Sequence, residues 1–369
     1  MQLTSMRSWL PNAPQGKSPI LISGPCSAES RKQVLASCKG VAEQGAHMLR
    51  AGIWKPRTRP GSFEGVGEVG LPWLIEAGKA TGLPTCCEVA KAEHVAAALR
   101  AGVDVLWIGA RTSVNPFAVQ EVADALQGVD VPVMVKNPVN PDLPLWIGAL
   151  ERLYKAGIDK LAAIHRGFSV SNAAPYRNLP IWYLPIDLRR ELPDLTLIND
   201  PSHIAGRRSL LLQVAQKALD LDFDGWMIES HIDPEVALSD AAQQVTPNGL
   251  RNLLDSLVYR TAQSEDPEFK ANLEALRYDI DNIDQQLFDL LSQRMEVARE
   301  IGKYKQANNV QILQMDRWRH IFATRSRQAR AGGLNDRFAE QVLQALHEES
   351  IQQQTHMMTP EKAPNGRAQ

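Results

Sequence analysis

Residues 93–111 read EHVAAALRAGVDVLWIGAR and contain one complete repeat of the pattern that decides the fold. Residues 93–101 place apolar side chains along one side of a helix, Gly102 ends that helix, and the apolar run 105–110 follows. A helix that ends in glycine before an apolar run is typical of the junction between a helix and a buried strand. The stretch therefore predicts strands and helices that alternate around a parallel sheet.

The same pattern recurs along most of the chain. Eight apolar runs, most of them separated by one amphipathic helix, lie at residues 20–26, 47–54, 83–89, 105–110, 132–137, 161–166, 196–203 and 225–230. Eight successive βα units of about 25–35 residues predict a (β/α)₈ barrel. A doubly wound open sheet is the alternative, but no glycine-rich nucleotide-binding fingerprint follows the first run.

Beyond the barrel, a polar stretch ends the alternation and the chain reads as helices. We expect a barrel domain over 1–262, a linker over 263–268, an all-helical domain over 269–356 and a disordered tail over 357–369. The helices are expected at 269–306, 315–330 and 335–355. Three helices of such unequal length cannot bury the long apolar stripe of the first, so we expect the helical domain to pair as a homodimer.

Composition and charge restrict the class of protein. The 369 residues include 40 basic and 42 acidic side chains, a net charge of −2, so no overall field draws the chain to nucleic acid or to a membrane. No apolar run approaches the ~20 residues of a membrane span, and the first residues lack the apolar stretch of a signal peptide. The expected location is the cytoplasm.

The carboxyl ends of the predicted strands carry the candidate functional residues. In a barrel these ends meet at one mouth, where catalytic side chains gather. The residues there are Cys26, Lys55 with Arg57, Glu88, Arg111, Lys136, His165 with Arg166, His203, and Glu229 with His231. Solvated caps explain charged or coordinating side chains at one strand end but not at nearly all eight, so we expect an active site.

Four residues form a set of mixed metal ligands. They are the thiol of Cys26, the imidazole of His203 and the carboxylates of Glu229 and, a few residues later, Asp240. Such a set suits a borderline divalent ion such as Mn²⁺, Fe²⁺, Co²⁺ or Zn²⁺ rather than Ca²⁺. No short-range spacing such as CxxC is present, so this prediction depends on the convergence of the strand ends.

A second set of residues at the mouth is cationic. Its members are Arg50, Lys55, Arg57, Arg111, Lys136 and Arg166. So many cations would repel one another unless anions bind among them, and arginine matches phosphate and carboxylate in bidentate fashion. Their number predicts more than one phosphate, or a phosphate with a carboxylate. A metal beside them would serve to polarise a carbonyl.

These residues stand in motifs that resemble the 3-deoxy-7-phosphoheptulonate (DAHP) synthases, over about residues 18–262. The motifs are GPCS (24–27), KPRT (55–58), IGAR (108–111), HRG (165–167), DPSH (200–203) and IESH (228–231), followed by LSDAAQ (238–243). These enzymes condense phosphoenolpyruvate with erythrose 4-phosphate in the shikimate pathway of aromatic amino-acid biosynthesis. The resemblance implies one divalent ion per barrel, Mn²⁺ before Fe²⁺, Co²⁺ or Zn²⁺, on Cys26, His203, Glu229 and Asp240.

The resemblance also implies the substrate contacts. Phosphoenolpyruvate would be held by Arg50, Lys55, Arg111, Lys136 and Arg166, and erythrose 4-phosphate by Arg57 and Thr58. Lys55 would in addition protonate the new alkoxide. The KPRT loop differs from the KANRSS-like loop of the related synthases that use arabinose 5-phosphate, which favours erythrose 4-phosphate.

The first predicted helix of the C-terminal domain carries cations among its apolar residues. Arg294 and Lys305 are 11 residues apart, which places them about 20° apart in rotation and ~16 Å apart along the helix, so their long side chains could close around a small anion. Arg277 lies ~25 Å from Arg294 along the axis and on another face. A partner chain could supply it.

Residues 273–305, LEALRYDIDNIDQQLFDLLSQRMEVAREIGKYK, resemble the first helix of the all-helical chorismate mutases, whose dimers share each site between chains. The resemblance implies rearrangement of chorismate to prephenate by Arg277 of the partner with Arg294, Lys305, Arg317 and Gln354, of which Lys305 and Gln354 donate to the ether oxygen. Gln314 and Trp318 stand where other members have acids near the substrate hydroxyl.

Two readings of the helical domain follow. It is a second enzyme, or it is only a dimerisation and ligand-sensing module. In either case prephenate bound there could act as an allosteric feedback ligand of the barrel.

Overall fold

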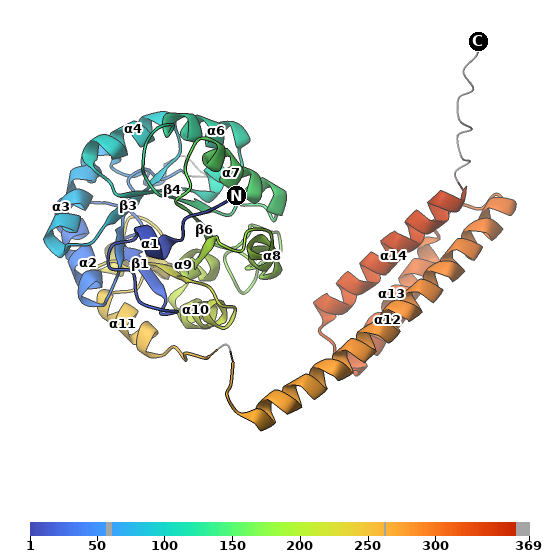
Figure 1. Cartoon of the computed structure of the whole chain (residues 1–369). Coiled ribbons are helices and arrows are strands. Elements are labelled where there is room, and N and C mark those ends of the chain that lie inside the picture. The colour runs from blue at the N-terminus through green and yellow to red at the C-terminus, as the bar shows by residue number, and fades with distance from the viewer. Residues whose placement is uncertain (57–60, 262, 359–369) are drawn as a thin grey trace, which may run out of the picture. The chain divides into compact units, whose positions relative to one another are not determined.

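The computed structural model describes residues 1–56, 61–261 and 263–358. The chain divides into two compact units, Met1–Arg260 and Thr261–Gln369. The first is a closed parallel barrel and the second is a group of helices (Figure 1). The predicted fold class, a (β/α)₈ barrel followed by an all-helical region, is confirmed, and the open sheet is excluded because the first and last strands pair.

The barrel wall contains eight strands among the described residues. They are β1 (Ile20–Gly24), β2 (Met48–Arg50), β3 (Thr85–Val89), β4 (Val105–Ile108), β5 (Val133–Lys136), β6 (Leu161–His165), β7 (Thr196–Asn199) and β8 (Gly225–Glu229). Each lies parallel to the next in sequence, and β1 closes the barrel on β8 with Ile20 opposite Gly225 and Gly24 opposite Glu229. All eight predicted runs therefore contain a strand.

Helices surround the strands and connect them. In the first unit they are α1 (Met6–Trp9), α2 (Arg31–Glu43), α3 (Leu71–Thr81), α4 (Ala92–Ala101), α5 (Ala110–Ser113), α6 (Pro116–Ala125), α7 (Leu143–Lys155), α8 (Tyr183–Glu191), α9 (Pro201–Ala205), α10 (Leu211–Asp220) and α11 (Pro247–Asp255). Gly82 and Gly102 end α3 and α4 in the left-handed conformation that glycine adopts without strain. The run predicted at 196–203 is divided, because the Asp200 side chain caps α9 directly after β7.

Strand residues alternate between the inside of the barrel and the layer under the outer helices, as the pleat of a strand requires. Ile20, Ile22, Met48, Cys86, Val105, Trp107, Met134, Ala162, Ile164, Ile198 and Met227 pack together inside. Their neighbours in sequence, such as Leu21, Leu49 and Leu106, pack under the helices. Helix α1 lies across the amino-terminal end of the barrel (Figure 1), where Met6 and Leu10 join the interior cluster.

The second unit consists of α12 (Pro267–Ala307), α13 (Met315–Ala331) and α14 (Asp336–Met358). Helices α12 and α13 contain the helices predicted at 269–306 and 315–330, and α14 begins one residue after the start predicted for the third. Helix α14 includes residues 357 and 358, which were predicted to belong to the tail, because Met357 packs beside Gly302 of α12. The rest of the predicted tail, 359–369, lies outside the described residues. Among the described residues, no helix is long and apolar enough to span a membrane.

Closure of the barrel gives a testable prediction. A Cβ at Gly225 would collide with the backbone carbonyl oxygen of Ile20, its partner on β1. Because the Cβ is fixed by the backbone of β8 and the oxygen belongs to the backbone of β1, the clash cannot be relieved without disturbing the ladder. We expect Gly225→Ala to lower the free energy of unfolding of the barrel by roughly 1–3 kcal/mol, measured by denaturant or thermal unfolding.

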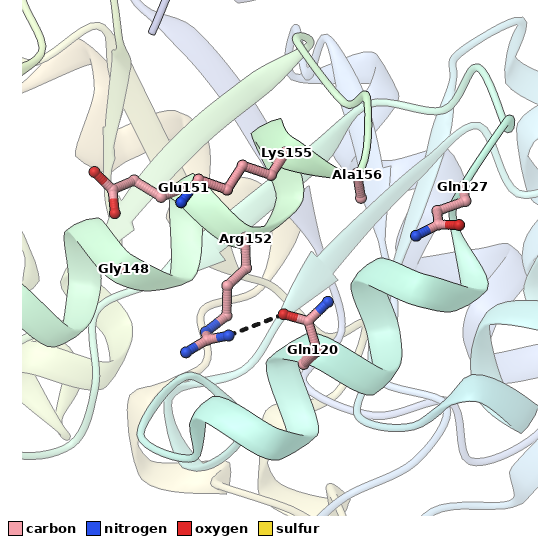
Figure 2. Close-up of a pocket in the computed structure, with 7 residues that line it drawn as sticks. All are labelled: Gln120, Gln127, Gly148, Glu151, Arg152, Lys155 and Ala156. Carbon is pink, nitrogen blue, oxygen red and sulfur yellow. Dashed lines mark hydrogen bonds between the residues drawn. The ribbon is translucent and has the colours of Figure 1, made fainter.

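The matched control is Gly148→Ala. Gly148 lies in α7 beside an open groove (Figure 2), and a Cβ there would meet no atom within 4 Å. Alanine is favoured over glycine within a helix by about 0.8–1 kcal/mol, so this variant is expected to be as stable as the wild type or more stable. Equal destabilisation of both variants would contradict the argument from strand closure.

Candidate functional site

Three predicted metal ligands meet at the carboxyl end of the barrel. Cys26 lies two residues beyond β1, Glu229 ends β8, and Asp240 lies in the segment that follows. Pairing of β1 with β8 brings the first two together, and one ligand atom each from Cys26, Glu229 and Asp240 lies within 4.8 Å of the others. Cys26 and Glu229 are buried and Asp240 is half-buried, so a cation bound there would be largely shielded from water.

The fourth predicted ligand, His203, adjoins this cluster from α9. Its Nε2 atom lies 3.7 Å from Glu229 Oε1. That oxygen is buried and accepts no hydrogen bond from any described residue, although the Arg50 guanidinium pairs with it at 3.2 Å, so it keeps capacity for a cation. The donor set of sulfur, nitrogen and oxygen fits a borderline divalent cation.

The pKa values of Cys26 and Glu229 shift in opposite directions. Burial raises the pKa of Cys26 to about 12, so the thiol holds its proton until a cation displaces it. Burial also acts to raise the pKa of Glu229, but His203, Arg50 and Lys55 outweigh it and the carboxyl is more acidic than usual. Glu229 is therefore ready to bind a cation as a carboxylate.

The predicted phosphoenolpyruvate cations adjoin the same cluster. Arg50 Nη2 lies 3.2 Å from Glu229 Oε1 and donates to the Cys26 carbonyl at 3.3 Å. Lys55 Nζ lies 3.0 Å from both the sulfur and the carbonyl oxygen of Cys26. Lys136 Nζ, at the end of β5, pairs with Asp200 Oδ2 at 2.8 Å. The predicted metal ligands and substrate cations thus belong to one connected network.

The remaining cations at the mouth are Arg166 and Arg111. Arg166 Nη1 donates to Asn178 Oδ1 at 2.7 Å. The pKa of Arg166 is lowered to about 10, chiefly by burial and in smaller part by Arg177 and Arg111, against the opposing effect of Asp200. Arg111 lies in α5 directly beyond β4, at the same end of the barrel. Arg57 and Thr58 lie outside the described residues.

The sequence assigns no role to two residues of the network, Asp200 and Gln243. Asp200 Oδ2 contacts both Lys136 Nζ and His203 Nδ1, the latter at 2.7 Å, and its Oδ1 accepts from the His203 amide. Gln243 Nε2 donates to Glu229 Oε2 at 2.7 Å and lies 3.4 Å from Asp240 Oδ2. Asp200 opens the DPSH motif and Gln243 ends LSDAAQ, so both were present in recognised motifs.

His165 does not lie in the mouth, and its place among the strand-end candidates is wrong. Because Ile164 points into the barrel, the pleat turns His165 outward. There it packs among the rings of Phe168, Trp182 and Phe223, and its Nε2 lies 2.6 Å from the Pro180 carbonyl. Burial lowers its pKa to about 3, so it is a neutral core residue. The alternation of inward and outward side chains along the run 161–166 predicts this outward position of His165.

His231 and Glu88 also differ in surroundings from the metal ligands. His231 is buried against Glu29, with 3.5 Å between Nε2 and Oε2, and its Nδ1 accepts from the Asp233 amide. Glu88 Oε2 accepts from Trp107 Nε1 at 3.0 Å. Neither belongs to the cluster of predicted ligands formed by Cys26, Glu229 and Asp240.

The helical unit holds a cavity of about 510 Å³ between its three helices. Five predicted residues line it: Arg294, Lys305, Gln314, Arg317 and Gln354. None of the described lining residues is acidic, so the cavity is strongly cationic. Burial lowers the pKa of both Arg294 and Lys305, and Gln354 Oε1 is buried without a hydrogen-bond partner among the described residues. An anionic ligand with polar substituents would satisfy these groups.

Arg277 does not line this cavity. It is exposed on α12 and pairs with Glu274, with 2.6 Å between Nη1 and Oε1. Trp318 does line the cavity, and its ring stacks on His347 at 3.8 Å between ring centres. Arg294 is held by Ser350, to whose Oγ it donates at 2.6 Å.

A further groove lies on the outer wall of the barrel between α6 and α7, away from the strand ends (Figure 2). It measures about 280 Å³, and Arg152 Nη1 donates to Gln120 Oε1 across it at 2.9 Å. Its lining residues are Gln120, Gln127, Gly148, Glu151, Arg152, Lys155 and Ala156. None of the predicted site residues is among them.

Comparison with known families agrees with this geometry. Residues 12–263, which include the entire barrel, match the DAHP synthetase I family. The chain belongs to the DAHP synthetase I family. Residues 276–355, which contain all five predicted residues of the helical cavity and Arg277, match the family described as Chorismate mutase type II. The chain thus joins a DAHP synthetase I domain to a type II chorismate mutase domain.

Individual relatives agree with this division. Phospho-2-dehydro-3-deoxyheptonate aldolase of Thermotoga maritima is 33% identical over 225 residues, which cover 61% of this chain and 64% of that protein. A crystal structure of that enzyme, titled a DAHP synthase, superposes with a TM-score of 0.58 at 27% identity and covers 70% of each chain. The T-protein of Enterobacter agglomerans is 36% identical over 80 residues, 22% of this chain and 21% of that protein.

The network around Asp200 gives the prediction for this site. Asp200→Asn preserves the shape of the side chain but removes the charge shared by Lys136 and His203, so the imidazole loses its anionic partner. Loss of such a partner typically weakens metal binding about 10–100-fold. We expect that loss in the affinity for Mn²⁺, measured by calorimetry on the folded protein.

The control is Asp194→Asn, which changes an exposed aspartate before β7 and should bind Mn²⁺ as the wild type does. Wild-type affinity in Asp200→Asn would show that Asp200 does not support the metal ligand.

Proposed function

We propose that the barrel catalyses the metal-dependent condensation of phosphoenolpyruvate with erythrose 4-phosphate to DAHP and phosphate. The observation that carries the proposal is the junction at the mouth, where a cluster of S, N and O donors adjoins buried cations. Membership of the DAHP synthetase I family supports the same reaction. The substrates carry a carboxylate and two phosphates in total, which suits the excess of cations.

Each set of residues has a role in this proposal. Cys26, His203, Glu229 and Asp240 would hold one divalent ion, with Mn²⁺ as the first candidate. When bound, such an ion polarises the aldehyde of erythrose 4-phosphate or activates a water. Arg50, Arg111, Lys136 and Arg166 would bind the carboxylate and phosphate of phosphoenolpyruvate, whereas Arg57 and Thr58 would bind the sugar phosphate.

The bond changes then assign a task to Lys55. C3 of phosphoenolpyruvate attacks the aldehyde carbon, and the aldehyde oxygen takes up a proton as it becomes a hydroxyl. Lys55 Nζ, directly beside Cys26, is the proton donor in this proposal. Water adds at C2, and cleavage of the bond between C2 and the phosphate oxygen releases phosphate. Holding both substrates in this alignment supplies much of the rate enhancement.

Replacement of Lys55 tests the barrel activity. Lys55→Met removes the proton donor and one substrate cation, so turnover should fall by about 10²–10⁴-fold at saturating substrates. The measurement is the consumption of phosphoenolpyruvate with erythrose 4-phosphate, and with arabinose 5-phosphate as the competing aldehyde. The latter is relevant because one relative, the 2-dehydro-3-deoxyphosphooctonate aldolase of Rhodopseudomonas palustris, is 26% identical over 258 residues.

Lys79→Met, an exposed lysine in the last turn of α3, is the control and should retain full activity. Metal content measured on both variants separates loss of the donor from loss of the ion. Near-normal turnover of Lys55→Met would remove the assigned role, and a preference for arabinose 5-phosphate would change the substrate.

We propose that the helical unit converts chorismate to prephenate. This rearrangement is unimolecular and needs no nucleophile, so a site has to hold the reactive conformer and stabilise charge on the breaking ether bond. Arg294 and Arg317 would bind carboxylates, while Lys305 and Gln354 would donate to the ether oxygen and Gln314 would contact the hydroxyl. Support comes from the cationic lining of the cavity and from the family match.

We further propose that a second copy of the chain completes this site. Along α12, Leu276, Ile280, Ile283, Leu287 and Leu290 are between 49% and 62% exposed, too much apolar surface for one face of a solitary helix. Beside the cavity, a second groove of about 510 Å³ is lined by Leu334, Phe338, Val342 and Leu346. A partner helix seated there would cover apolar surface on both chains and could bring its Arg277 to Arg294.

Mixing of two inactive variants tests both the mutase and the shared site. Arg277→Ala and Lys305→Ala should each lose most chorismate consumption, because each lacks one cation of every site. After exchange of subunits, half of the dimers are mixed and contain one intact site, so about one quarter of wild-type activity should return.

The control is Lys303→Ala mixed with Lys305→Ala, because Lys303 is exposed and does not line the cavity. The homodimer of Lys303→Ala, measured alone, should remain active. Failure of the first mixture to regain activity would contradict a shared site. No turnover in the wild type would favour the other reading, a dimeric sensor, for which the Trp318–His347 stack in the cavity wall is the supporting observation.

Two finer points belong to the same proposal. Prephenate, as product of the helical unit, would act as a feedback ligand that slows the barrel. The protein would act in the cytoplasm, where it would meet the small-molecule substrates of both reactions.

A further inference from the structure

A buried tryptophan lies directly beneath the predicted phosphoenolpyruvate site. Trp107 is in the middle of β4, is fully buried and points into the barrel. Met48 precedes Arg50 by two residues on β2, and Met134 precedes Lys136 by two residues on β5, so each methionine lies one layer deeper in the barrel than the cation. Trp107 therefore occupies the level at which the apolar interior meets the charged mouth.

Two cations of the mouth face this one ring. Arg50 Cζ lies 5.0 Å from the centre of the Trp107 ring, and Lys136 Nζ lies 5.8 Å from it. Both are within the ~6 Å at which a cation is attracted to the negative face of an indole. Arg50 is 1% exposed, and its Nε and Nη1 atoms have no hydrogen-bond partner among the described residues. The ring thus adds to the contacts that Glu229 and the Cys26 carbonyl make with this buried guanidinium.

The ring itself is fixed by its neighbour on the next strand. Glu88 is opposite Trp107 in the register of β3 and β4, so both side chains point to the same side. The Trp107 Nε1–H donates to Glu88 Oε2 at 3.0 Å. A Cβ at Gly109 would collide with Glu88 Oε1, so the glycine of the IGAR motif leaves room for this carboxylate. Gly109, Glu88 and Trp107 thus form one supporting unit.

We infer that Trp107 is a positioning residue for the binding of phosphoenolpyruvate: its indole, oriented by Glu88, holds Arg50 and Lys136 side by side for the anionic substrate. The inference rests on the proposed function of the barrel. Trp107 is neither one of the predicted metal ligands nor one of the predicted substrate-binding residues. Without the ring, Arg50 and Lys136 keep their partners Glu229 and Asp200 but lose the π face that attracts both of them, so their positions for an anion are less well fixed. Substrate affinity then falls, whereas the chemical step at Lys55 is affected less.

Calorimetry of phosphoenolpyruvate binding to the full-length, Mn²⁺-loaded protein tests the inference. Trp107→Leu removes the π face and should raise the Kd about tenfold to thirtyfold, in line with a cation–π contribution of about 2 kcal/mol at a desolvated site. Trp107→Phe retains a ring and should recover part of that loss. In steady-state kinetics the KM for phosphoenolpyruvate should rise more than kcat falls.

Fluorinated tryptophan at position 107 tests the charge of the ring face separately from packing, because the analogue fills nearly the same space as the natural side chain. Each added fluorine weakens the negative face while the shape of the ring is nearly retained, so the Kd should rise stepwise with fluorine number. Trp226→Leu is the control, because Trp226 is equally buried but lies under the outer helices, where it donates to the Ala215 carbonyl. This variant should lose stability while it keeps the wild-type Kd.

The outcomes separate the inference from the function on which it rests. Normal binding by the wild type and an unchanged Kd across the fluorinated series would overturn the role of Trp107 alone. Absence of phosphoenolpyruvate binding by the wild type would overturn the proposed function of the barrel, and the inference with it. An equal rise of Kd in Trp226→Leu and Trp107→Leu would show that the effect is only structural and would also overturn it.

Discussion

The two-residue pleat of the barrel strands is the constraint on which the active site depends. Inside the barrel, apolar side chains such as Met48, Met134 and Met227 form a closed core. Two residues further along the same strands, the pleat returns to the interior and presents Arg50, Lys136 and Glu229. The core and the charged mouth are therefore successive layers of one structure, and a change of strand register would move both.

Charge compensation then determines how these buried groups can coexist. Arg50 faces Glu229, and Asp200 lies between Lys136 and His203. A buried ion that lost its partner would be strongly destabilising, so the predicted metal ligands and substrate cations are held as one network. Binding of an ion to Glu229 and His203 would alter the field at Arg50 and Lys136. Metal and anionic substrate are thus expected to affect each other's binding.

The helical unit follows a different principle. Its cavity is enclosed by three helices of one chain, and Arg294, Lys305, Arg317 and Gln354 reach it without help. Yet α12 leaves a long apolar stripe exposed and carries Arg277 far from the cavity. A helix of 41 residues cannot be covered by partners of 17 and 23 residues. The same feature that limits burial in one chain offers a surface to a second.

The sequence by itself determined the order of the eight strands, the three C-terminal helices and most residues of both candidate sites. These follow from periodicity and capping, which are local properties, and from motifs that carry the site residues. The roles of Asp200, Gln243 and Trp107, and the outward place of His165, were decided only by the tertiary structure. They depend on which side chains neighbouring strands and loops bring opposite one another, as with Trp107 and Glu88 on β4 and β3. Such pairings join residues distant in sequence, and spacing along one strand contains no information about them.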